Sequence, residues 1–475
     1  MDSDDSEEPL HNVVEGEDAE PLGEKPMKLK VYKQRWFILF IFSCVSFANG
    51  VLYTCIVSIN DIIARYYRVK EDRVDWAGNI FPFMYIFMAL PSAYMMTSLG
   101  LRTLVIIGSS LNAIGTCLHF AGVFGNGYRF IMGGQVAAAL SFPTILQVPV
   151  RLSTVWFPEY EHAKATSIAM VANVFGLGIG FLQPSYMVPD VETKEDIYAG
   201  LYDLYLTHLI FLIVCLGLVY SFFKEKPPLP PSFAAAVSKF RTEDDDSVEK
   251  EGESPTMIQS IKVLTVNKNF LILTQAYALY FGLYLFYVTC LNDMVSHLVE
   301  EIYIGWMGFS ADVAAIIGIL VCSVIIDKFQ AYQICSLVLT FGVLVSWTLF
   351  ALSVVRWKST IALFVTYAMV SLFGAPFFVV GIEYTAEVTY PISEGLSSAI
   401  ILLLGNLYGF LMVLFFGSWI EKGHLGFATY FVIGVYAVCF ILVCFLRQTL
   451  NRHDAERHHK RPQTTNGEEN DPLLI

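Results

Sequence analysis

The chain has 475 residues, of which 55% are hydrophobic and only 15% are charged. A soluble protein of this length could not bury so much apolar surface, whereas a lipid bilayer accepts it, so an ordinary soluble protein is excluded. The formal net charge of −13 does not indicate a basic partner, because nine acids lie in the first twenty residues and seven more lie between Glu243 and Glu253. Such runs are typical of solvated tails and linkers, and no nucleic-acid partner is expected.

Twelve apolar segments are long enough to cross a bilayer as helices, since about twenty helical residues span about 30 Å of hydrocarbon. The chain is therefore predicted to be an all-α membrane protein that crosses the lipid bilayer twelve times. In chain order the predicted segments are 35–59, 75–98, 103–123, 128–156, 163–187, 200–223, 270–297, 304–326, 332–354, 360–386, 395–418 and 427–446.

A polar segment, 224–262, separates the sixth predicted helix from the seventh. Four prolines between residues 227 and 231 are followed by the second acidic run, which indicates a flexible cytoplasmic linker. The predicted organisation is an acidic disordered cytoplasmic tail (1–34), a first six-helix half (35–223), this linker, a second half (263–446) and a C-terminal tail (447–475). With the N-terminus inside, twenty of the thirty Lys and Arg residues fall on the inner side and nine on the outer. Both termini are therefore predicted to be cytoplasmic.

Two sets of residues recur in the two halves at nearly the same spacing. The stretch 155–161 resembles 388–394, and fifteen residues past the proline of each stands an asparagine, Asn173 or Asn406. A glycine follows each asparagine three residues later. Gly50 and the pair Asn60-Asp61 likewise recur as Gly282 and Asn292-Asp293. Such parallel repeats are typical of a large transporter class that binds its substrate between two pseudo-symmetric halves.

Several short motifs carry a family resemblance. The most specific is Glu387–Pro391 followed by Ser393–Gly395; the others are Val74–Trp76, Gly100–Arg102, Gly108–Asn112, Gly133–Gln135 and Arg151–Phe157. They resemble the major facilitator superfamily and, more narrowly, the feline leukaemia virus subgroup C receptor-related transporters, over roughly residues 33–450. The resemblance implies the major facilitator superfamily fold and transport of a small solute by alternating access. Substrates known in the family are choline, ethanolamine, haem and pyridoxine.

The resemblance also implies a substrate site. Asn49 and Asn173 match family positions that contact substrate, and Asn406 stands where relatives have glutamine. Tyr53 lies one helical turn after Asn49 and replaces a tryptophan of choline-transporting relatives, where an aromatic face would hold a quaternary ammonium. The competing interpretation is hydrogen bonding between helices for the asparagines and core packing for the aromatics. The candidate substrate-binding residues are Asn49, Tyr53, Phe142, Asn173, Tyr284, Tyr287 and Asn406.

Charged residues at predicted helix ends indicate gates. Arg151, Glu161, Glu383, Glu387 and Glu394 lie at cytoplasmic helix ends related by the repeat, and the resemblance assigns Asp327 to an inner latch. We expect salt bridges there. Two further acids in or near apolar runs, Asp293 and Asp312, are candidates for carrying a coupling proton, with an outer-vestibule charge as the alternative.

Other chemistry is not indicated. No phosphate-binding loop, metal motif or nucleophile arrangement is present, so neither an enzyme nor a cofactor is expected. Apart from Arg151, no Lys or Arg lies in the interior of a predicted helix, which favours a neutral or cationic solute over an anion such as haem. A non-transporting receptor or scaffold remains the alternative. The C-terminal sequence Glu469–Ile475 resembles an acidic dileucine signal for sorting adaptors, which leaves open the plasma membrane or an endosomal or lysosomal membrane.

Overall fold

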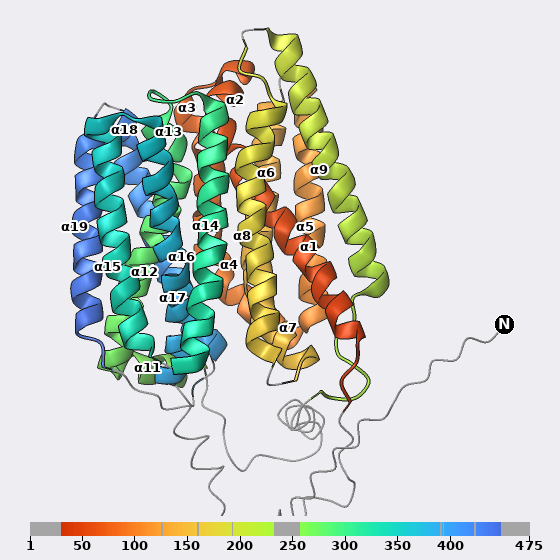
Figure 1. Ribbon diagram of the computed structural model, residues 1–475. Helices are drawn as coiled ribbons and strands as arrows, with labels where there is room; N and C mark the ends of the chain where they lie inside the picture. Colours follow the sequence, from red (N-terminus) through yellow and green to blue (C-terminus); the bar gives the residue numbers. More distant parts are fainter. Residues whose placement is uncertain are drawn as a thin grey trace, which may run out of the picture.

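The computed structural model describes residues 30–124, 127–158, 161–191, 193–231, 257–329, 331–389, 392, 394–421 and 424–447. Within them, twelve helices are long and apolar enough to cross a membrane, which confirms the predicted twelve-helix fold class. They form a bundle in which the chain runs alternately up and down (Figure 1). We call the end where α1 begins and α19 finishes the terminal end, and the opposite end the far end.

The first half consists of ten helical elements. They are α1 (Gln34–Thr54), η1 (Val57–Ile59), α2 (Asn60–Tyr67), α3 (Glu71–Val74), α4 (Trp76–Ser98), α5 (Leu101–Gly122), α6 (Tyr128–Leu146), α7 (Val148–Trp156), α8 (His162–Met187) and α9 (Lys194–Phe222).

The second half has the same alternation and begins with a short helix at the terminal end. Its elements are α11 (Met257–Val266), α12 (Lys268–Thr289), α13 (Leu291–Val295), α14 (Glu301–Phe329), α15 (Tyr332–Leu352), η3 (Ser353–Trp357), α16 (Thr360–Thr389), α17 (Glu394–Met412), η4 (Val413–Gly417), α18 (Ser418–Glu421) and α19 (Leu425–Cys444).

Three segments predicted as single helices are interrupted, and one of them, 270–297, breaks at Cys290 between α12 and α13. The segment 35–59 leaves α-helical geometry after Thr54, whose hydroxyl donates to the Leu177 carbonyl of α8 at 2.7 Å. The segment 128–156 is interrupted at Gln147, two residues before Pro149, whose missing N–H and fixed φ suit the first turn of a new helix. Neither the Thr54 contact with α8 nor the backbone effect of Pro149 changes the mean hydropathy of its segment, which is why hydropathy alone did not show the interruptions.

The sequence repeat has a physical basis in close helix packing. A Cβ on Gly50 would lie 3.0 Å from the backbone nitrogen of Leu177, so α1 and α8 touch backbone to backbone. At the equivalent place in the second half, a Cβ on Gly282 would lie 2.9 Å from the backbone nitrogen of Gly409, between α12 and α17. Small residues allow such close approach in membranes, and the two halves use it at matching positions.

The halves meet along two helix pairs, α8 with α14 and α4 with α17. In the first pair Gly308 packs against the Phe181 ring. In the second, Phe410 of α17 lies 6.1 Å from Trp76 and 5.0 Å from Phe83 of α4 between ring centroids.

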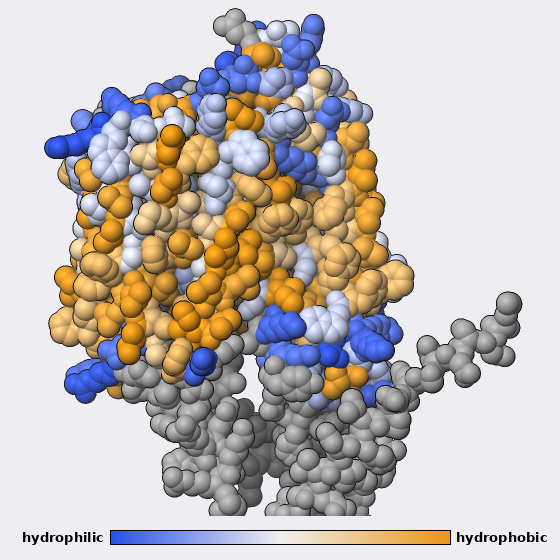
Figure 2. All heavy atoms as spheres, viewed as in Figure 1, coloured by the Kyte–Doolittle hydropathy of each residue, from blue (hydrophilic) through white to orange (hydrophobic). Residues whose placement is uncertain are grey.

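The outer surface of the bundle is apolar where it would face lipid. Figure 2 shows a hydrophobic band around the middle, with hydrophilic residues gathered toward the ends. Exposed apolar side chains such as Val324 of α14, 68% exposed, and Phe341 of α15, 55% exposed, contribute to this band. In water so large an apolar surface would be unstable, and a bilayer removes that cost.

Candidate functional site

Asn49 lies in a buried polar cluster inside the first half. Its amide nitrogen donates to Ser141 Oγ at 2.7 Å and to Asn112 Oδ1 at 3.0 Å, so one residue joins α1, α5 and α6. Ser141 also donates to Asn112. The side chain is 0% exposed, and its own Oδ1 has no hydrogen-bond partner within the described residues. The nitrogen of Asn49 therefore serves helix packing, while its oxygen remains available.

Aromatic rings of the first half gather beside this cluster. Tyr53 of α1 stacks on Phe81 of α4 with ring centroids 4.4 Å apart, and Phe142 of α6 lies 5.9 Å from Tyr53. Tyr85 closes the group from α4, 5.8 Å from Phe142. The sequence-predicted pair Tyr53 and Phe142 is thus brought together, and Tyr53 has its hydroxyl near Thr289 of the second half.

A second aromatic group faces the first from the other half. Tyr284 and Tyr287 of α12 lie 5.3 Å apart between ring centroids, and Tyr287 meets Tyr367 of α16 at 5.7 Å. Phe281 and Leu285 of α12 pack in one buried cluster with Tyr53 and Phe142. We call the rings of Tyr53, Phe81, Phe142, Tyr284 and Tyr287 the central aromatic layer.

The two repeat-related asparagines occupy equivalent helices but have different surroundings. Asn173 of α8 is half-buried and donates to the Ser46 carbonyl of α1 at 2.8 Å. Asn406 of α17 is 0% exposed and donates to the Leu402 carbonyl of its own helix at 2.8 Å. Its Oδ1 has no hydrogen-bond partner within the described residues, and a buried unpaired acceptor costs about 1–3 kcal/mol.

The candidate proton-carrying acids lie at different depths. Asp312 is in α14, eleven residues after the helix begins, and is 8% exposed. Its carboxylate lies against Gly178 of α8, because a Cβ on that glycine would be 3.4 Å from Asp312 Oδ2. Asp293 is half-buried in α13 at the far end.

Contacts between the halves close the far end. Asn292 of α13 donates to Asp61 of α2 at 3.0 Å, which links two of the repeat-related positions across the halves. Thr289 packs against Gly78 of α4 close by. Asn60, next to Asp61, donates instead to Asp75 within its own half.

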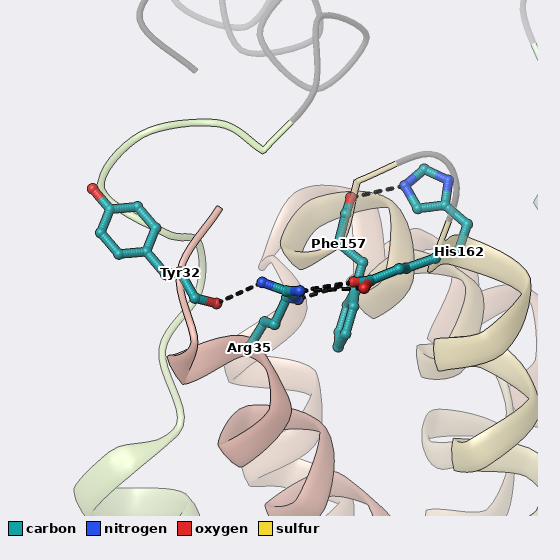
Figure 3. Close-up of polar contacts among 5 residues, drawn as sticks. Tyr32, Arg35, Phe157 and His162 are labelled. Atoms are coloured by element: carbon teal, nitrogen blue, oxygen red, sulfur yellow. Dashed lines mark hydrogen bonds and ion pairs between the residues drawn. The ribbon is translucent and has the colours of Figure 1, made fainter. Parts of the chain in front are cut away.

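At the terminal end Glu161 forms an ion pair within the first half. Its carboxylate accepts from Arg35 Nε at 3.0 Å and Nη2 at 3.3 Å, and the guanidinium also donates to the Tyr32 carbonyl. Figure 3 shows Arg35 reaching from the start of α1 toward Phe157, whose carbonyl contacts the His162 ring at 2.9 Å. Glu161 therefore fastens α1 to the α7–α8 connection.

The other candidate gate residues lie on α7, α14, α16 and α17. Arg151 is exposed on α7, and Glu383 and Glu387 are half-buried on α16 near the terminal end. The side chains of Asp327 and Glu394 lie outside the described residues. A gate between the halves built from these groups stays a prediction.

Two histidines of the first half are buried beside the same tyrosine, and a third histidine lies apart from them. His119 of α5 and His208 of α9 are buried, with ring centroids 5.2 Å and 6.4 Å from that of Tyr205. His297 is exposed beyond α13, where partial burial and the nearby Lys358 lower its pKa.

Sequence reasoning missed several residues that the structure brings to these places. Arg35 and Tyr367 carry no motif, and their partners lie 126 and 80 residues away in the chain. Phe81 stacks directly on Tyr53, although nothing in the sequence distinguishes it from the other phenylalanines of the apolar segments. Their positions follow from which helix faces meet, and no short-range pattern could have found them.

Comparison with known proteins agrees with this architecture. The sequence profile of the Major Facilitator Superfamily matches residues 39–389, so the chain belongs to that superfamily. Among solved structures it is similar to a D-xylose–proton symporter, with a TM-score of 0.64 and 12% identity over 88% of this chain and 99% of that one. It is also similar to the E. coli fucose–proton symporter FucP, with a TM-score of 0.58 and 16% identity over 88% of this chain and 100% of that one.

Curated relatives cover most of the chain. The choline/ethanolamine transporter FLVCR2 of Homo sapiens is 28% identical over 441 residues, which are 90% of this chain and 81% of that protein. The choline/ethanolamine transporter FLVCR1 of Felis catus is 27% identical over 430 residues, 89% of this chain and 74% of that protein. The chain is therefore a multi-pass membrane transporter related to the FLVCR proteins, and its partners are the lipid bilayer and a small-molecule substrate.

Proposed function

We propose that this transporter moves a small organic cation of the choline or ethanolamine type, bound at the central aromatic layer, by alternating access of its two halves. The observation that carries the proposal is the composition of this layer. Its rings come from both halves, and the buried residues of the described chain include no Lys or Arg. Aromatic faces attract an ammonium by about 0.5–2 kcal/mol each, whereas a buried base would repel it. The relatives named above are choline/ethanolamine transporters, which agrees with this class.

The amide oxygens of Asn49 and Asn406 support a ligand with hydrogen-bond donors. Both are buried and unpaired within the described residues, so a hydroxyl or ammonium N–H reaching either would remove the cost of an unsatisfied acceptor. We assign Asn173, which the repeat relates to Asn406, to the opposite wall of the same site. The moving bodies are the segments 35–223 and 263–446.

Transport assays in proteoliposomes test this proposal. Purified protein is expected to take up labelled choline or ethanolamine, and Asn406→Ala and Asn173→Ala are each expected to lower uptake by about tenfold, the effect of about 1.4 kcal/mol of lost binding. Thr207→Ala, an exposed site on α9 that bonds its own helix, is the control. Pyridoxine and haem belong in the panel, because uptake of either without choline or ethanolamine would refute the substrate class. Unchanged uptake in both asparagine variants would remove the site.

We further propose that both termini face the cytoplasm and that Leu473 and Leu474 direct the protein to endosomes or lysosomes through sorting adaptors. The support is the excess of Lys and Arg on the terminal side and the acidic residues before the leucines. Replacing both leucines by alanine is expected to move a tagged protein to the plasma membrane. An unchanged distribution by microscopy would refute the sorting role.

A further inference from the structure

Asp312 is the feature of the membrane-spanning region that needs an explanation. It is the only carboxylic acid among the buried residues of the described chain, and it lies near the middle of α14. No hydrogen bond or ion pair reaches its carboxylate from any described residue. Gly178 of the partner helix α8 packs against Asp312 and against the Phe309 ring of α14 at this level. An acid so placed has no group of the protein to balance its charge.

The titratable groups that face Asp312 are tyrosine hydroxyls. Tyr284 and Tyr287 of α12 and Tyr367 of α16 lie within electrostatic range of its carboxylate. Tyr284 and Tyr287 belong to the central aromatic layer, and Tyr284 also lies within electrostatic range of Tyr53 of the first half. Asp312 therefore lies at the α8–α14 contact where the two halves meet.

A bare carboxylate in this environment is costly, because no cation of the described protein replaces its lost hydration. It must be neutralised in every state that buries it. Two species can do this at a site free of Lys and Arg: a bound organic cation or a proton. Both cannot be held at once by a single negative charge, so they compete.

We infer that Asp312 is the anionic partner of the transported cation and that it carries a proton when the cation is absent. The protein then exchanges one organic cation for one proton. The arriving cation displaces the proton from Asp312, and the proton leaves to the side from which the cation entered. After the cation has been released on the other side, the empty transporter returns to its first orientation only once Asp312 has taken up a proton from that other side. This inference rests on the proposed substrate class and adds the coupling.

The exchange predicts a definite pH dependence. Protons compete with the cation, so each unit of acidification in the range where Asp312 is protonated raises the apparent Kd of choline or ethanolamine about tenfold. An acidic vesicle lumen therefore drives accumulation of the cation, and uptake makes the lumen more alkaline.

The first experiment measures both movements in proteoliposomes that contain a pH-sensitive dye. The wild-type protein is expected to accumulate labelled choline or ethanolamine under an acidic lumen and to alkalinise the lumen in step with uptake. Asp312→Asn is expected to lose both effects, Asp312→Glu to restore part of them, and Asp203→Asn on the exposed face of α9 to behave like wild type. Cation uptake by wild type that ignores the pH gradient and moves no protons would overturn the exchange while leaving the proposed function intact.

A second measurement does not require transport. Dicyclohexylcarbodiimide modifies protonated carboxyl groups in apolar surroundings, and mass spectrometry locates the modified residue. Asp312 in the purified full chain is expected to react with the reagent. Addition of choline or ethanolamine is expected to reduce the extent of this modification. Absence of modification between pH 5 and pH 9 would overturn the inference, as would modification that neither cation reduces. A protein that reacts at Asp312 but moves no cation of the panel would instead refute the proposed substrate class.

Discussion

The backbone contact between α1 and α8 gives the sharpest stability prediction. A Cβ on Gly176 would lie 2.9 Å from the Phe47 carbonyl carbon, and the carbonyl oxygen is nearer still. An ordinary contact needs about 3.4 Å, so Gly176→Ala must push two helix backbones apart by at least about 0.5 Å. Overpacking of this kind costs about 1–3 kcal/mol, and rigid backbone on both sides places the cost at the upper end.

Two other glycines in the same protein separate this strain from the intrinsic effect of alanine. Gly217 of α9 has nothing within 4 Å of its added Cβ, so Gly217→Ala gains only the helix propensity of alanine, up to about 1 kcal/mol. Gly409 is intermediate, because its Cβ would meet the Cβ and Cδ1 of Leu285 at 2.8 Å, whereas the nearest backbone atom lies at 3.3 Å. Since all three variants share the propensity gain, differences between them measure the strain.

The assay is the apparent melting temperature of the purified protein in detergent, measured at one scan rate because unfolding of such proteins is rarely reversible. We expect Gly217→Ala to melt highest, Gly409→Ala next and Gly176→Ala lowest, below wild type. Equal melting temperatures for Gly176→Ala and Gly217→Ala would refute the reasoning, because they would show that α1 and α8 do not approach as closely as described.

Two further predictions concern the ends of the bundle. Asp61→Ala removes the hydrogen bond from Asn292 that joins the halves at the far end. Loss of about 1.4 kcal/mol should make opening of this end about tenfold more frequent. The readout is the rate of maleimide labelling of buried Cys290, and a rate equal to that of wild type would contradict the closure role. Arg35→Ala breaks the two-pronged, largely buried pair with Glu161 and should lower stability by about 1–3 kcal/mol, with Arg35→Lys recovering only part. A melting temperature unchanged in Arg35→Ala would show that this pair does not fasten α1.

Much of the architecture could be predicted from the sequence because a bilayer imposes simple rules. Backbone groups in hydrocarbon must pair within their own segment, so runs of about twenty apolar residues become helices. The repeat of Gly50 and Asn173 as Gly282 and Asn406 correctly indicated two related halves, since matching backbone contacts need small residues at matching places. The interruptions of two helices required the contact of Thr54 with α8 and the placement of Pro149.

The surroundings of the site residues depended on the tertiary structure. Helices such as α14 are apolar on nearly every side, so no stripe in the sequence tells which face meets protein and which meets lipid. Sequence alone identified Asp312 as a costly acid, but only the packing of α8, α12 and α16 around it set its position among tyrosines without a basic partner. Likewise Asn49 was selected from its sequence position, whereas its bonds to Asn112 and Ser141 required helices 63 and 92 residues away. The hydropathy of successive segments determined the number of helices. The partners of each polar group depend on how each helix is rotated and packed against its neighbours, which only the folded bundle decides.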